Sequence, residues 1–195
     1  VVLAAQQLRT ASSLFDLAQI LQKKQVHLAF GGWIFNREPS LRERVPGHFL
    51  SDRLDEAVER IGQIMTFMPP MSSCVSVPEV YEKAAQMYRQ KRPRIELDVL
   101  QTLIEHDVSY EHLFKANNRL YEDITAALNL GDLKFIDAEL RWDMQLMRNY
   151  DIPASWSHQY FKTYYNSAKQ YLNQEADLIL NWLAETPTIY NGAKS

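Results

Sequence analysis

The sequence lacks the features that define several large classes of proteins. Its single cysteine, Cys74, rules out an intramolecular disulfide, which fits a reducing compartment. No apolar run approaches the roughly 20 residues that span a bilayer, and no basic stretch precedes the first apolar run, as it would in a signal peptide. The net charge of −3 gives no field that would attract nucleic acid or an anionic membrane. We therefore predict a cytoplasmic protein that binds neither nucleic acid nor a membrane.

The common catalytic and metal-binding motifs are absent as well. The sequence contains no GxSxG, GxGxxG or P-loop motif, and no HExxH or CxxC pair. His106 and His112 are six positions apart, so they do not share a helix face. Acidic residues fall mostly on the polar positions of predicted helices. We predict no catalytic residue, no protein-only metal site and no enzymatic activity.

Residues 1–69 alternate between strand-like and helix-like segments. Strands are predicted at 1–5 and 26–30, helices at 10–24 and 53–65, and a loop at 36–50. This alternation predicts an α/β domain with a partial, Rossmann-like parallel sheet. Two strands are too few for such a sheet, so we expect an upstream portion of the same domain to supply the rest.

The remainder of the chain has a helical pattern. Residues 70–77, PMSSCVSV, read as a linker after Pro69 and Pro70. Residues 78–195 are predicted to form an all-α helix bundle, because their apolar residues recur at helical spacing. Five helices are expected, separated at Pro93, Gly131 and Pro153 among other positions: 78–91, 94–106, 109–129, 132–150 and 154–185.

Two strand ends in the α/β part carry the candidate binding residues. Ligands of open α/β sheets bind outside the carboxyl ends of the strands, and bare glycine backbone lets a flat ligand approach closely. The stretches AAQQ at 4–7 and GGWIF at 31–35 lie at such ends. The alternative is that the glycines only turn the chain and the glutamines only cap a helix. The candidate cofactor-binding residues here are Ala4, Ala5, Gln6, Gly31, Gly32, Trp33 and Phe35.

These stretches resemble the second half of cobalamin (vitamin B12)-binding domains. VVLAAQQLRT, a helix, VHLAFGGWIFN and then PGHFLSDRLDEAVERI follow the family's order over about 65 residues, the last segment resembling its closing strand and helix. In that family a Ser-x-Leu turn meets the nucleotide tail of cobalamin, and a Gly-Gly pair lies beside the tail. Here Gln6 takes the serine position. The family's cobalt-ligating Asp-x-His-x-x-Gly loop does not occur in the sequence, and in the family it precedes the part matched here.

The helical part carries an aromatic face in its last predicted helix. Trp156, Tyr160 and Tyr164 recur near one side of that helix. They either fill the bundle core or line a pocket for a large conjugated ligand such as a linear tetrapyrrole.

The resemblance implies a cobalamin-binding sensory or regulatory module. Its general plan is similar to that of cobalamin/bilin photoreceptors, which use a linear tetrapyrrole as a chromophore together with cobalamin. In this chain the tetrapyrrole is expected at the interface of the α/β and helical parts. The alternatives are a cobalamin-carrying subunit of an enzyme and a cofactor-free protein-interaction module. A corrinoid or tetrapyrrole ligand and a second copy of the chain are the expected partners. On this reading, Gly32→Val is expected to abolish corrinoid uptake while sparing the helices.

Overall fold

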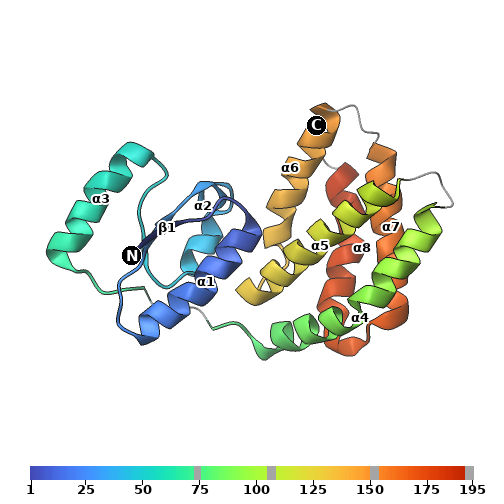
Figure 1. The fold of residues 1–195 in the computed structure, drawn as a ribbon, viewed down its shortest axis with the longest axis horizontal. Helices are drawn as coiled ribbons and strands as arrows, with labels where there is room; N and C mark the ends of the chain where they lie inside the picture. Colours follow the sequence, from blue (N-terminus) through green and yellow to red (C-terminus); the bar gives the residue numbers. More distant parts are fainter. Residues whose placement is uncertain (73–75, 105–108, 150–153, 192–195) are drawn as a thin grey trace. The chain divides into compact units, whose positions relative to one another are not determined.

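The computed structural model describes residues 1–72, 76–104, 109–149 and 154–191. The chain divides into two compact units, Val1–Val77 and Pro78–Ser195 (Figure 1). The division falls at the end of the predicted linker. Each unit is described by itself.

The first unit contains a small parallel sheet and flanking helices. Its strands are β1 (Val2–Ala4), β2 (Ala29–Gly31) and β3 (His48–Phe49), in the order β1-β2-β3. Leu3 of β1 lies opposite Phe30, and Ala29 lies opposite His48. The helices are α1 (Leu8–Lys23), α2 (Trp33–Arg37), the 3-10 turn η1 (Pro39–Glu43) and α3 (Leu54–Phe67). The prediction of parallel strands with helices between them is confirmed.

Helix α1 begins two residues before its predicted start because of a local cap. The Oγ1 atom of Thr10 accepts hydrogen bonds from the backbone N–H groups of Gln6 (3.1 Å) and Gln7 (3.0 Å). The helix start thus satisfies backbone groups that have no partner within the helix. The buried face of α1 forms much of this unit's core, with Leu8, Ala11, Leu14, Phe15 and Ala18.

The predicted loop at 36–50 is wrong in part, because it contains secondary structure. The end of α2, η1 and β3 all fall within it. His48 N–H donates to the carbonyl of Leu28 (2.8 Å), and Leu50 N–H donates to that of Phe30 (2.9 Å). These bonds attach the segment to β2. A two-residue strand is too short to show an alternating sequence pattern.

The two adjacent glycines differ in what surrounds them. Gly32 has φ +116° and ψ 166°, a region that essentially only glycine occupies. A Cβ there would lie 2.1 Å from the carbonyl oxygen of Ala5, whereas a Cβ at Gly31 would meet no atom within 4 Å. Gly32 is therefore needed for the close approach of the protein's own backbone.

The second unit is a helix bundle, as predicted. It contains α4 (Glu79–Ile104), α5 (Tyr110–Leu130), α6 (Phe135–Asn149), α7 (Ala154–Tyr171) and α8 (Asp177–Asn191), with the 3-10 turn η2 (Gln174–Ala176) between the last two. Gly131 ends α5 with φ +80°, a common helix C-terminus. In the described residues, no helix is both apolar enough and long enough to cross a bilayer.

Two predicted helix boundaries in this unit are wrong. The predicted break at Pro93 does not occur, because α4 continues through it with Tyr88, Ile95 and Val99 buried on either side. Packing on both sides therefore outweighs the hydrogen bond that proline cannot donate. The predicted helix 154–185 is instead divided, and the side chain of Asn173 accepts from the N–H of Glu175 (3.0 Å) at the start of η2.

The glycine contrast makes a first prediction. Gly32→Ala is expected to destabilise the α/β unit by about 3 kcal/mol, because it adds backbone strain and a clash with Ala5. Gly31→Ala, the matched control, is expected to change the free energy of unfolding by less than about 0.5 kcal/mol. Urea unfolding of both variants provides the measurement. Equal losses of unfolding free energy in the two variants would contradict the argument that the close contact with Ala5 requires glycine at position 32.

Candidate ligand-binding pocket

A cavity of about 540 Å³ opens at the carboxyl ends of β1 and β2. Of the predicted residues, five line it: Ala4, Gln6, Gly31, Gly32 and Trp33. The open side of Gly31 therefore faces space rather than protein. The other lining residues are Val2, Leu3, Asn36, Leu50, Ser51, Asp52, Arg53, Leu54, Ala57, Val58 and Ile61.

Two of the predicted residues lie in the core instead. The Ala5 residue is fully buried, and its carbonyl oxygen lies against Gly32. Phe35 is also fully buried, with its ring centroid 4.9 Å from that of Phe30 and 6.3 Å from that of Phe49. We leave both out of the candidate site, because neither offers a surface to a ligand.

One wall of the pocket is the apolar face of α3. Leu54 and Val58 line the pocket but are 87% and 70% exposed. Met65 and Phe67, further along α3, are also exposed, and Ile64 is this helix's buried apolar residue. The wall is thus apolar yet only weakly packed against its own unit. Sequence periodicity predicted the helix at 53–65 but not that its apolar face would stay uncovered.

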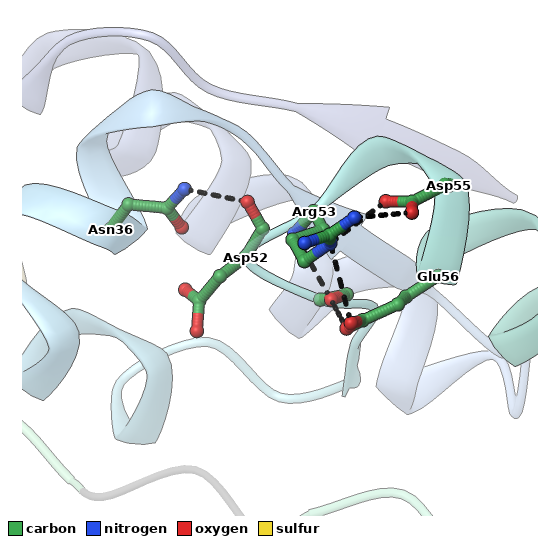
Figure 2. Close-up of polar contacts among 6 residues, drawn as sticks. Asn36, Asp52, Arg53, Asp55 and Glu56 are labelled. Carbon is green, nitrogen blue, oxygen red and sulfur yellow. Dashed lines mark hydrogen bonds and ion pairs between the residues drawn. The ribbon is translucent and has the colours of Figure 1, made fainter.

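Other residues that line the pocket are polar and are held by hydrogen bonds and ion pairs, some of which Figure 2 shows. The Nδ2 atom of Asn36 donates to the backbone carbonyl of Asp52 (3.1 Å). The Oδ1 atom of Asn36 is buried and has no hydrogen-bond partner among the described residues. The backbone N–H of Trp33 donates to Oε1 of Gln6 (3.4 Å). The polar part of the lining therefore includes the side-chain amides of Gln6 and Asn36.

The charged groups at the pocket mouth compensate one another. Arg53 donates to Asp55 (3.1 and 2.6 Å) and lies 3.5 Å from a carboxylate oxygen of Glu56. The hydrogen bonds that Arg53 donates to Asp55 raise the pKa of Arg53 and lower the pKa of Asp55. Asp52 is paired with Arg42. Among the described residues that line the pocket, Arg53 is the one cation, and it is already paired. The site therefore suits neutral polar groups and apolar surface better than a bare anion.

Of the aromatic residues predicted to hold a tetrapyrrole, Tyr160 and Tyr164 lie in the bundle core. Trp156 is half-buried and stacks on Tyr160 with 5.6 Å between ring centroids. The hydroxyl of Tyr160 donates to Oδ1 of Asn117 (2.9 Å), and that of Tyr164 lies 2.6 Å from the hydroxyl of Tyr88. Burial raises the pKa of both Tyr88 and Tyr164. The hydroxyls of Tyr160 and Tyr164 are thus satisfied inside the protein, so we do not keep these rings in the candidate site.

A cluster of carboxylates surrounds Arg119 in the helical unit. Arg119 lies 2.7 Å from Asp143, 3.9 Å from Glu139 and 4.0 Å from Asp123. Burial is the main cause that raises the pKa of Asp123 from 3.8 to about 7, with Glu139 and Asp143 adding to it against Arg119. The part of the chain that the structure describes holds no group of three or more His, Cys, Asp or Glu residues suited to a metal ion.

Comparisons of the chain with protein-family models, with curated proteins and with solved structures found no match. The candidate site is therefore argued from its own geometry.

The buried hydroxyl pair makes a second prediction. Tyr88→Phe and Tyr164→Phe are each expected to destabilise the helical unit by about 1–2 kcal/mol, because each leaves one buried hydroxyl without its partner. The double variant should lose less than the sum, by about 1 kcal/mol. Urea unfolding measures all three variants, with the exposed Tyr110→Phe as control. Strictly additive losses would contradict a direct interaction between the hydroxyls.

The buried carboxyl makes a third prediction. Because the pKa of Asp123 is higher in the folded protein than in the unfolded chain, the folded state binds the proton more tightly. The contribution of Asp123 to stability should therefore fall as the pH rises from about 4 to about 7 and stay flat above that range. At about pH 8, Asp123→Asn should be more stable than the wild type by roughly 1–3 kcal/mol. The measurement is the difference in unfolding free energy between the two proteins across this pH range. A difference that stays constant with pH would contradict the argument.

Proposed function

We propose that the α/β unit binds the nucleotide tail of a cobalamin in the pocket beside Gly31, and that the protein is a cobalamin-dependent sensory or regulatory module. The observation that carries the proposal is the bare, unobstructed face of Gly31 in the wall of a cavity at the carboxyl ends of two parallel strands. Open α/β sheets bind their ligands in this place. The resemblance to cobalamin-binding domains puts a Gly-Gly pair beside the cofactor's tail.

The pocket is large enough for one part of a large ligand but not for the whole ligand. Its volume of about 540 Å³ lies within the roughly 300–1,000 Å³ typical of small-molecule sites. A complete corrinoid is larger than such a cavity, whereas a flat base with its ribose is not. The corrin ring would then lie outside the pocket.

The chemistry of the lining also fits a nucleotide tail. Gly31, Leu3 and Ile61 offer apolar surface for a flat base. The carboxamides of Gln6 and Asn36, which both line the pocket, are suited to ribose hydroxyls or ring nitrogens. A bound corrinoid would supply absorption of visible light. The residues of this chain would hold its tail in place and shield it from water.

Two further parts of the proposal follow from the same unit. Strand β1 is at the edge of the sheet, so a further parallel strand from the expected upstream portion of the domain could pair with it. The helical unit would then carry the signal, as in light sensors of similar plan.

A second candidate function is a cofactor-free interaction module. The exposed apolar side chains of α3, Leu54, Val58 and Met65, favour it, because exposed apolar faces often contact other proteins. In that case a partner protein, rather than a cofactor, would cover α3.

The fourth prediction tests the pocket with a substitution that its geometry tolerates. Gly31 lines the cavity and a Cβ added there meets no protein atom within 4 Å, so Gly31→Leu should lower the affinity for hydroxocobalamin at least about tenfold and leave stability little changed. Gly62→Leu is the matched control, because a Cβ at Gly62 also meets nothing within 4 Å and Gly62 does not line the pocket. These variants replace Gly32→Val, whose added side chain would disturb the fold itself.

The measurement is absorbance titration of the full-length protein with hydroxocobalamin and with cobinamide, which lacks the nucleotide tail. Weaker binding of cobinamide than of hydroxocobalamin, by at least about tenfold, is expected if the tail fills the pocket. Equal affinity of Gly31→Leu and Gly62→Leu, or no corrinoid spectrum after reconstitution, would reject the proposal and favour the interaction module.

A further inference from the structure

Two imidazole rings lie in contact at the amino end of β2. The Nδ1 atom of His27 and the Nε2 atom of His48 are 3.1 Å apart, and the rings stack with 5.3 Å between centroids and 11° between planes. His48 is 8% exposed and belongs to β3, whereas His27 is half-buried and precedes β2. Sequence analysis found no role for either ring. Neither residue lines the pocket.

The charged side chain that acts on this pair is cationic. Arg60 of α3 acts on His48 electrostatically and lowers its pKa. Among the described residues, neither imidazole forms an ion pair with a carboxylate. A proton added to this cluster therefore meets positive charge and no compensating anion.

The hydrogen bond between the rings limits their protonation. One ring nitrogen must accept the bond, and a nitrogen that carries a proton cannot accept. The pair can therefore hold one extra proton but not two without losing the bond. In agreement, burial, His27 and Arg60, in that order, lower the pKa of His48.

The pH dependence of the unit's stability follows from the lowered pKa of His48. Since the pKa of His48 is lower in the folded protein than its ordinary value of 6.5, the unfolded chain binds this proton more tightly. The stability that the neutral ring of His48 contributes is then fully present above about pH 6.5 and is lost as the pH falls through the lowered pKa.

The pair is connected to the wall of the pocket. Strand β3 continues directly into Leu50, Ser51, Asp52 and Arg53, all of which line the cavity, and then into α3. Helix α3 buries one apolar residue, Ile64, and carries the Arg60 charge that doubly protonated rings would repel. A weakly packed wall next to a repulsive cluster is the first part of the unit expected to open.

We propose that the His27–His48 pair is a pH-sensitive switch for the pocket, in which the second proton breaks the bond between the rings and loosens α3. The switch rests on the pocket of the proposed function but not on the identity of its ligand. Protonation would open the α3 wall and weaken binding, and deprotonation would close it.

The test measures backbone hydrogen exchange of the full-length protein without any ligand. Peptides from Leu54–Phe67 are followed at about pH 7.5 and about pH 5.5 and corrected for the intrinsic pH dependence of exchange. The protection of α3 in the wild type should fall severalfold at the lower pH, because the second proton removes the bond between the rings. Because glutamine stays neutral and can still hydrogen bond with His27, His48→Gln should change less than twofold over the same range.

The control is His112→Gln, which replaces an exposed histidine of the helical unit and should keep the wild-type pH dependence. Equal protection of α3 in the wild type at the two pH values, or unchanged pH sensitivity in His48→Gln, would overturn the proposal. If His48→Gln does not fold, NMR titration of the wild-type His48 ring protons decides, since the pKa of His48 should lie below its ordinary value of 6.5 and an equal or higher midpoint would refute the switch. Because no cofactor is added, failure of the cobalamin proposal would not affect these results.

Discussion

The α/β unit depends on one close approach between two backbones. Gly32 follows β2 and presses against the carbonyl of Ala5, which follows β1, at a distance where any side chain would collide. The hydrogen bond from Ala5 N–H to the carbonyl of Gly31 (3.0 Å) holds the two strand ends together at the same point. This contact places Gln6 and Trp33 on the rim of the pocket and directs the open side of Gly31 into it. The two adjacent glycines thus serve different purposes, the first keeping space free and the second joining the strands.

The pocket has a rigid side and a loose side. Strand pairing and the phenylalanine core behind it, formed by Phe30, Phe35 and Phe49, fix the sheet side. The α3 side is anchored mainly through Ile64 and the turn at Ser51, whose hydroxyl accepts from Arg53 N–H (3.1 Å) and donates to Glu56 (2.6 Å). A ligand that covers the apolar face of α3 would remove exposed apolar surface and so stabilise the helix. Binding and the ordering of α3 are therefore expected to be coupled, and the histidine pair acts on the same helix.

Sequence reasoning succeeded where local pattern decides structure and failed where packing decides it. The apolar runs of β1 and β2 and the stripe of α1 are visible because burial imposes a period. The continuation of α4 through Pro93 was not predictable, because it depends on buried neighbours on both sides of the proline. For the site, residue types located the pocket at Gly31, but they could not tell that Phe35 turns into the core. The open face of α3 was missed because periodicity shows which side of a helix is apolar, not whether anything covers it.

The hydroxyl pair of Tyr88 and Tyr164 limits which amino-acid substitutions the helical unit can accept in evolution. These residues lie on α4 and α7, far apart in the sequence, yet their hydroxyls form a hydrogen bond with each other in the core. Losing one oxygen leaves the other stranded in an apolar interior, whereas losing both leaves two phenylalanines of nearly the same shape. Homologous chains should therefore carry tyrosine at both positions or at neither, so that these two positions covary as a signature of the bundle.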